Sequence, residues 1–578
     1  MTGVVLETLS TKKLIAFYSI VLIFHAVFFL LGGLIAPAPN TSDQILTTKC
    51  IDRSSDPLNN KKWFFTRPVT SNHSCEEILP EGDLSEVVPA GVDANQIVFV
   101  AQFPLPRNDY DLKMTKWFQQ MVAILMLDIK YKSEFEALQD SSVSFHVRLG
   151  YRNHGDGVNE WKELAHSLET RPLSCKLDPD TKKHAHNGQD KSSSFFYDCE
   201  ILPLFTLGSV HYDYYLVNIR IPSMANKNIN THLGLLQDIW MVEIHQNGGF
   251  TKVWFALKTV MFPVTLAALI FFWRRVLELE RRPTFLERTT LTLGVVISIL
   301  NLPIEWLSLV INVPFWLVLS DLRQGAFYAT LVCFWLVFTG EHSMGGGSND
   351  SPGSISLLLE KLGLSKQYWS KLILVAGASC ALFIFELAER GVQLRNPFYS
   401  IWSHPNAARM GFGTMIVGSV CAVVYFIYLA YLVTKALLTM LDKRRRLHTL
   451  PDERRLFYSG VIYRFSTLLA YTALCALLTV VFFICSQLNE DQWKWGEHSL
   501  EYSSAFITGV YGMWNIYVCS VLCLYAPSRK YQSDPQMFQQ LIDNDNENED
   551  SQSGAVQMQV IAGAPPDGFK FIQKTAFE

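Results

Sequence analysis

The sequence predicts an α-helical multi-pass membrane protein, with about eight transmembrane helices and a β-sandwich domain inserted after the first of them. Three observations predict this fold class. The chain of 578 residues is 49% hydrophobic yet 18% charged, which is too apolar for an ordinary soluble protein and too charged for one lying wholly in a bilayer. Its apolar runs are separated by one polar block of about two hundred residues. Within that block, apolar residues alternate as in half-buried strands.

Each apolar run is long enough to cross a bilayer, which takes about 20 helical residues. The third and fourth runs are the least clearly divided, because only Pro314 and the Asp321/Arg323 pair interrupt a nearly continuous apolar stretch. The predicted spans are residues 14–36, 253–273, 289–312, 321–341, 369–390, 408–435, 461–487 and 503–526.

The first run, residues 14–36, is interpreted as an uncleaved anchor, because its about 23 apolar residues exceed the ~7–15 of a signal-peptide core. Positive residues near span ends stay cytosolic. With alternating spans, the basic clusters around Lys12, Arg274, Lys443 and Arg529 all fall on one side. We therefore expect a cytosolic N-terminus at 1–13, a luminal domain at 37–250, a seven-helix bundle at 251–527 and a disordered cytosolic tail at 528–578.

Strand patterns fill the polar block. In "VSFHVRLGY", Val143, Phe145 and Val147 share one face and Ser144 and His146 the other, a period of two. Similar patterns occur in "QIVFVAQF", "MVAILMLDIKY", "FFYDCEILPLF", "YYLVNIRI" and "DIWMVEIH". This spacing predicts a β-sandwich of about seven strands. The two glycines that join it to the second span, Gly248 and Gly249, indicate either close seating on the bundle or a flexible hinge.

Four of the eleven cysteines lie in the polar block, at Cys50, Cys75, Cys175 and Cys199. An even number in an exported domain suggests disulfides. Three pairings are open, and the sequence-local pairs Cys50–Cys75 and Cys175–Cys199 are the simplest. Acceptor tripeptides for glycosylation at Asn40 and Asn72 fall on the same side of the membrane as the cysteines.

Charged residues also occur within or beside the predicted spans, where ionised groups are costly and usually face a protein interior or a cavity. On a helix the spacing of Glu386, Glu389 and Arg390 puts all three on one face. With the group that opens the fourth span they predict a polar rim on the luminal side, although salt bridges at a helix end would explain them equally well. The fourth-span group is Asp321, Arg323 and Gln324.

Aromatic residues follow these charges. "NPFYSIW" supplies Asn396, Phe398, Tyr399 and Trp402, and the last span supplies Tyr511 and Trp514 at about helical spacing. A polar rim above an apolar, aromatic interior suits a ligand with a lipid tail and a polar body. An ordinary interfacial aromatic belt is the alternative for any one of these residues.

Several function classes are disfavoured. The net charge of −4 leaves no basic footprint for nucleic acid. No zinc-type CxxC pair, P-loop or GxSxG elbow occurs, so neither an enzyme nor a cofactor is expected. His184 and His186 in a charged loop are a weak basis for a metal site, and none is expected. The competing functions are a ligand-sensing signalling receptor and a proton-coupled transporter using Glu305, Glu386 and Glu389.

Several long motifs occur in the order found in one family. "LLGGLIAP", "IHQNGGFTKVWF", "DLRQGAFYA", "ERGVQLRNPFYSIW", "VYGMWNIYV" and "LYAPS" resemble the Wntless family over about residues 1–530. The resemblance implies a luminal β-sandwich above a bundle similar to that of G-protein-coupled receptors. It also implies that the palmitoleate of a Wnt protein enters a cavity in the bundle, with the residues of "ERGVQLRNPFYSIW" lining or bracing the opening.

The resemblance implies a cellular route as well. Lipid-modified Wnt proteins would be escorted from the endoplasmic reticulum through the Golgi to the plasma membrane. The carrier would then return through endosomes with clathrin adaptors and retromer. "YSGV", from Tyr458 to Val461, occupies the place of the family's tyrosine-based endocytosis signal, with valine as its last residue. Cargo identity, release mechanism and oligomeric state are not readable from the sequence.

Overall fold

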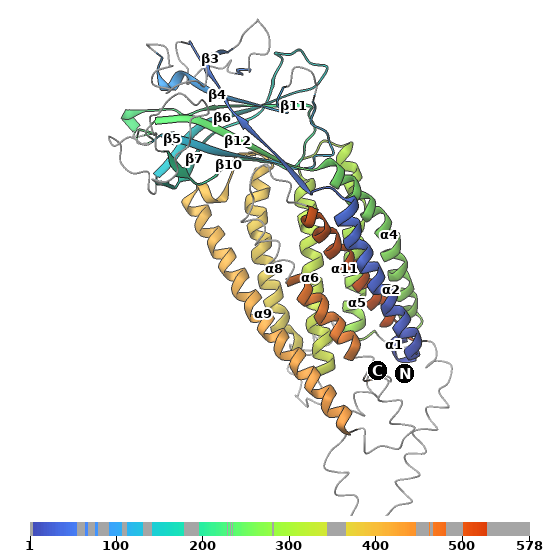
Figure 1. The fold of residues 1–578 in the computed structure, drawn as a ribbon. Coiled ribbons are helices and arrows are strands. Elements are labelled where there is room, and N and C mark those ends of the chain that lie inside the picture. The colour runs from blue at the N-terminus through green and yellow to red at the C-terminus, as the bar shows by residue number, and fades with distance from the viewer. Residues whose placement is uncertain are drawn as a thin grey trace, which may run out of the picture.

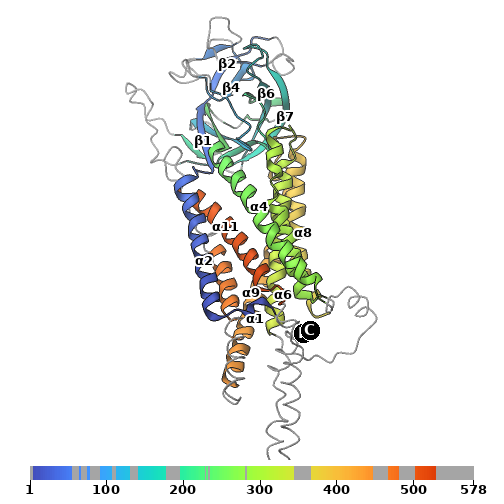
Figure 2. The same cartoon turned by 90° about the vertical axis from the view of Figure 1, so that its right-hand side faces the viewer.

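The structure is a computed structural model with two parts, a β domain at one end of a bundle of long helices (Figures 1 and 2). The segments that it describes are residues 4–54, 64–66, 75–78, 92–106, 112–130, 141–177, 196–227, 229–231, 233, 235–279, 283–343, 366–446, 462, 466–480 and 501–528. The predicted sites at Asn72, Tyr458 and Val461, the histidines His184 and His186, and the tail beyond residue 528 lie outside these segments.

The β domain consists of two sheets and a short two-stranded ribbon. One sheet has the strand order β1-β12-β5-β10, the other β3-β2-β4-β11-β6-β7, and β8 pairs with β9. Every adjacent pair is antiparallel. The strands are β1 Asn40–Leu46, β2 Thr48–Ile51, β3 Glu76–Ile78, β4 Ile97–Phe103, β5 Met121–Lys130, β6 Ser141–Arg152, β7 Lys162–Leu173, β8 Cys175–Leu177, β9 Tyr197–Cys199, β10 Leu202–Leu207, β11 Tyr214–Arg220 and β12 Leu235–Gln246.

The predicted strand alternation holds in β6, where Val143, Phe145 and Val147 are fully or almost fully buried in the core between the sheets. The described segments contain twelve strands, so the expected number of about seven was too low. Strands of three or four residues, such as β3, are too short to show a period. The edge strand β7 has a mostly exposed side-chain pattern and therefore a polar sequence.

Both sequence-local disulfides form. Cys50 of β2 is bonded to Cys75, immediately before β3. Cys175 of β8 is bonded to Cys199 of β9, directly opposite in the strand register. The pairing left open by the sequence is therefore Cys50–Cys75 and Cys175–Cys199.

Seven helices in the described segments are long and apolar enough to cross a membrane, so the chain is a multi-pass membrane protein. The eighth predicted span, 461–487, is described only as the shorter helical segment Ser466–Val480 and residue 462. A short helix, α1 Val5–Thr8, precedes the first of the seven. The long helices are α2 Thr11–Leu30 with its π-helical extension η1 Leu31–Ile35, α4 Gly248–Leu277, α5 Phe285–Asn301 with the 3-10 segment η4 Ile304–Leu309, α6 Trp316–Ser343, α8 Lys366–Gln393, α9 Pro405–Arg446 and α11 Glu501–Leu524.

The helices form two groups that share α6. Helix α11 packs on α2, α4 and α5, whereas α8 and α9 pack on each other and on α6, with α9 at the edge of the bundle in Figure 1. Small residues allow α2 and α11 to lie close, because a Cβ at Gly32 would collide with the Thr508 hydroxyl and one at Gly512 would collide with the Phe28 ring. The first span thus packs against the last one as part of the bundle.

The connection from β12 to α4 is compact. The Asn247 side chain accepts a hydrogen bond from the Gly249 backbone N–H at 2.8 Å and caps α4. A Cβ at Gly248 would lie 3.1 Å from Trp117, and one at Gly249 would lie 2.9 Å from Pro37. Of the two interpretations left by the sequence, this packing favours close seating of the β domain over a hinge.

Candidate functional site

The segment between α8 and α9 inserts into the underside of the β domain. We call residues 394–404 the docking loop. Phe398 is completely buried in the β-domain core, with its ring 5.9 Å from that of Phe205 and nearly perpendicular to it. The Thr206 backbone N–H donates to the Pro397 carbonyl at 2.9 Å. Phe398 therefore attaches the bundle to the β domain and does not line the interior of the helices.

Arg171 of β7 holds the docking loop in place. Its buried guanidinium pairs with Glu169 at 2.8 Å and donates to the Ser403 hydroxyl at 2.5 Å, to the Pro203 carbonyl at 3.2 Å and to the Phe398 carbonyl. Asn396 reaches the same Glu169 at 3.4 Å. A buried charge is tolerated when its partners satisfy it, and here those partners come from both domains.

The predicted polar residues of α8 lie just before the docking loop. Glu386 and Arg390 approach to 3.9 Å, with side chains 50% and 29% exposed. Gln393 donates to Glu389 at 3.4 Å and to the Tyr399 carbonyl at 3.1 Å, and it accepts from Arg390 at 3.2 Å. On α6, Asp321 lies close enough to Glu386 and Arg390 to interact with their charges. The structure thus brings these α6 and α8 charges together in a loose, half-exposed group.

The α6 face that bears Asp321 continues along the helix through Gly325, Tyr328, Val332 and Leu336, at spacings of three or four residues. In the half of the bundle away from the β domain, Val332 and Leu336 pack against α8 and α9. In the half near the β domain, Gly325 is exposed and a Cβ added to it would have no atom within 4 Å, and Tyr328 is 38% exposed.

Helix α8 shows the same change along its length. Val375 is buried against α6 and α9. Nearer the β domain, large apolar side chains are about half exposed, namely Leu382, Phe383, Ile384 and Leu387. In the α6–α8–α9 group, the residues around Val332, Leu336 and Val375 are therefore packed together, whereas several apolar side chains in the half beneath the docking loop are partly exposed.

A second polar group lies on the opposite side of α6. Arg323 donates to the carbonyls of Ile299, Leu300 and Leu302, where α5 ends, and to Glu305 at 3.0 Å. Lys258 of α4 pairs with the same Glu305 oxygen at 2.6 Å. Arg323 satisfies carbonyls that the break at Leu302 leaves free, so the structure separates it from Asp321.

The predicted residues of α11 belong to this second side. Tyr511 donates to Asn301 at 2.6 Å, and Asn301 donates to Asn515 at 2.5 Å. Trp514 is buried with its ring centroid 5.4 Å from that of Trp335. Sequence reasoning noted Glu305 but not Lys258, Asn301 or Asn515 as members of the group. The lone lysine inside an apolar run was a usable signal for Lys258, because such a charge needs a partner.

The remaining candidates lie at the edges of the site. Gln324 is exposed on α6, next to Arg323. Trp402 in the docking loop is 38% exposed and packs on Phe412 at 5.0 Å, and Tyr399 lies beside His404. Asn40 is exposed at the start of β1.

Comparisons with known proteins match both parts of the chain. Residues 48–246 match the family model described as the Wntless GOLD domain, and residues 247–529 match the Wntless-like transmembrane domain. The chain is 40% identical to "Protein wntless homolog" of Gallus gallus and 39% identical to that of Homo sapiens, over 93% of each chain. It is 41% identical to "Protein wntless" of Drosophila mojavensis, over 92% of this chain and 90% of the relative.

Proposed function

Since this chain belongs to the Wntless family, whose members act in Wnt secretion, we propose that it binds palmitoleoylated Wnt proteins and carries them to the cell surface. The protein is a carrier and not a catalyst in this proposal. The family match over both domains in order is the observation that supports it most. A signalling receptor or a proton-coupled transporter has no comparable support.

The acyl chain would lie between α6 and the α8–α9 pair, in the half of the bundle near the β domain. Three features support this place: the exposed face at Gly325 and Tyr328, the exposed apolar residues of α8, and the packed core that closes the far end. Burying a chain of about 16 carbons at ~0.8 kcal/mol per methylene contributes on the order of 10 kcal/mol. That is enough to hold a lipidated protein.

The polar part of the cargo would meet the charges above this face. Asp321, Glu386, Glu389 and Arg390 are loosely paired and half-exposed, so they remain able to bind a ligand. The docking loop, with Asn396, Phe398, Tyr399 and Trp402, would brace the opening. Arg323, Gln324, Tyr511 and Trp514 would support the α6 wall from the other side.

The cellular route belongs to the same proposal. The β domain would face the lumen, with Asn40 and Asn72 as glycosylation sites, and both termini would be cytosolic. Tyr458 to Val461 would bind clathrin adaptors, and retromer would return the carrier from endosomes to the Golgi. Exposed Asn40 and the two disulfides of the β domain support its exported position.

A bulky side chain placed in the proposed acyl site, the space between α6 and the α8–α9 pair near the β domain, tests the proposal. Gly325→Leu should not disturb the fold, because nothing lies within 4 Å of its Cβ position and leucine favours a helix over glycine by about 1 kcal/mol. We expect the variant to lose most capture of acylated Wnt in co-purification. The matched control is Gly413→Leu in α9, also an open glycine, which lies on the face opposite Gly411 and Gly418.

The second part of the experiment changes the cargo, using a Wnt whose acylated serine is replaced. The wild-type carrier should capture acylated Wnt but should not capture the unacylated form. Equal capture of both forms would contradict a lipid site, and unchanged capture by a well-folded Gly325→Leu variant would contradict its place beside α6.

A further inference from the structure

A separate cavity of about 230 Å³ lies where the β domain meets the ends of α6 and α8. We call it the junction pocket. Its walls come from three parts of the chain: β7 and the segment 206–215, residues 312–318 before and within the first turn of α6, and residues 390–397 in the last turn of α8 and just beyond it. Ligand pockets for drug-sized molecules occupy about 300–1,000 Å³, so it is too small for a palmitoleoyl chain together with its peptide.

Positive charge dominates the lining. Arg390 and Arg395 are the charged side chains that line the junction pocket, and no aspartate or glutamate of the described chain joins them. Arg395 makes no side-chain hydrogen bond or ion pair with any described residue. Arg390 donates to Gln393 at 3.2 Å, lies 3.9 Å from Glu386 and also interacts with the charges of Asp321 and Glu389. The Arg395 guanidinium is therefore the one more available to an anion, which arginine binds with two parallel hydrogen bonds, and Arg390 adds a second positive charge that it shares with these carboxylates.

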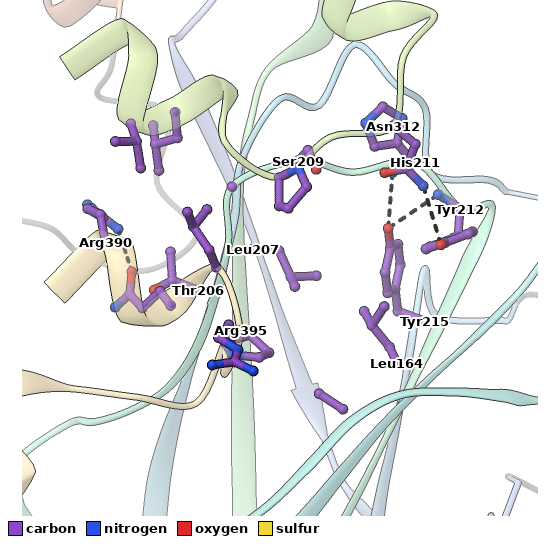
Figure 3. A pocket seen from close by; sticks show the side chains of 18 residues that line it. Leu164, Thr206, Leu207, Ser209, His211, Tyr212, Tyr215, Asn312, Arg390 and Arg395 are labelled. Carbon is purple, nitrogen blue, oxygen red and sulfur yellow. Dashed lines mark hydrogen bonds between the residues drawn. The ribbon is translucent and has the colours of Figure 1, made fainter. Parts of the chain in front are cut away.

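Neutral polar groups lie at the other end of the pocket, where Figure 3 shows His211, Tyr212 and Asn312 apart from Arg390 and Arg395. Neither ring nitrogen of His211 has a hydrogen-bond partner in the described structure. Burial, with Lys116 nearby, lowers the pKa of His211, so its neutral ring offers one donor and one acceptor. Unpaired buried polar atoms are uncommon in native proteins, and hydroxyl groups of a ligand would satisfy them.

The pocket lies at the ends of two membrane-spanning helices that face the β domain. Leu317 and Val318 are in the first turn of the α6 span, and Leu394 directly follows the last residue of the α8 span. Exposed aromatic side chains occur at the same ends, at Phe315 and Trp402, as in the belts at membrane surfaces. Apolar side chains at the ends of the two spans, together with Arg390 in the last turn of α8 and Arg395 just beyond it, match a molecule with acyl chains and an anionic head.

We propose that the junction pocket binds the headgroup of an anionic phospholipid from the leaflet beneath the β domain, with its phosphate on Arg390 and Arg395 and its hydroxyl groups toward His211 and Asn312. This pocket lies beside the proposed acyl site between α6 and α8 and shares Arg390 with the charges above that site. It does not depend on Wnt, and it would fasten the docking loop to the membrane surface.

The test measures lipid retained by the full-length protein, without cargo, by native mass spectrometry after exchange into micelles containing phosphatidylglycerol or phosphatidylcholine. Wild-type protein should retain phosphatidylglycerol preferentially. Arg390→Gln with Arg395→Gln should weaken that retention by about tenfold or more, because charged hydrogen bonds are lost. The control is Lys252→Gln with Arg409→Gln, which removes two exposed cations at the same end of the bundle but outside the pocket.

Arg395→Gln alone serves as a second variant, because this exposed side chain has no described contact whose loss would unfold the protein; it should show part of the loss. Three results would overturn the proposal. They are equal losses in the pocket and control variants, equal retention of the two lipids by wild-type protein, and displacement of bound lipid by inorganic phosphate at similar concentration, which would identify a free-anion site.

Discussion

On its α5 side, helix α6 presents Arg323, and on its α8 side it presents Asp321, only two residues away. Arg323 is 7% exposed and donates to three carbonyls and Glu305. Asp321 faces Glu386 and Arg390, whose own contact is 3.9 Å long and half open to the surroundings. The ionised side chains on the α5 side thus stabilise the contact between helices, whereas those on the α8 side remain able to bind a ligand. The difference depends on how many of their hydrogen bonds and ion pairs are already made within the protein.

The largest expected effect on stability comes from a substitution on the α5 side of α6, where the buried charges are paired. Glu305→Leu leaves Lys258 and Arg323 buried without a carboxylate, and removing one partner of a buried pair costs about 3–5 kcal/mol. We expect a markedly lower midpoint of thermal unfolding and a poor yield of monodisperse protein. Glu386→Leu is the control on the open side and should stay near wild type.

A paired substitution separates charge from packing. Lys258→Met combined with Glu305→Leu removes one uncompensated cation and leaves Arg323 on its three carbonyls, so it should regain part of the lost stability. A double variant as unstable as Glu305→Leu would show that packing at residue 305, and not charge balance, stabilises this side of α6.

A smaller, local effect is expected at the docking loop. Arg171→Met leaves Glu169 buried without its cation and removes the bonds to Ser403 and Phe398, a loss of about 2–3 kcal/mol. Hydrogen exchange should rise in residues 394–404 and in β7 but not in the far half of α8 and α9. Arg53→Met is the control, because its pair with Glu76 is exposed. An unchanged exchange rate in the docking loop would contradict the role given to Arg171.

The sequence predicts the architecture well, because its patterns are local. Apolar length identifies seven of the spans, and the period of two in Val143 to Leu149 identifies β6. The pairing of residues close in sequence, such as Cys175 and Cys199, which lie opposite each other in the strand register, can also be predicted from local patterns.

The sequence does not predict that the polar residues form two separate groups, because that separation depends on contacts between distant segments. Asp321 and Arg323 look equivalent in sequence, and only the helix period with the positions of α5 and α8 separates them. From the sequence, Phe398 is expected in an aromatic interior of the bundle. In the structure it packs against Phe205 of β10 and is buried in the core of the β domain. Lys258 and Asn301 needed partners from α5, α6 and α11 that no local pattern specifies.

The smallest effect on stability is expected on the open side, at Glu386. Glu386→Gln removes a long, half-exposed contact to Arg390, and exposed pairs contribute about 0–1 kcal/mol, so the unfolding midpoint should hardly move. If this side is held available for cargo, the same variant should lower Wnt capture severalfold, since a charged hydrogen bond to the ligand is lost. Glu76→Gln, which breaks an exposed pair far from the helices, should change neither quantity.

A Glu386→Gln variant that loses as much stability as Glu305→Leu would remove the distinction between the two sides of α6, because both groups of charges would then stabilise the fold. Unchanged stability together with full Wnt capture would leave the open side without a role in binding.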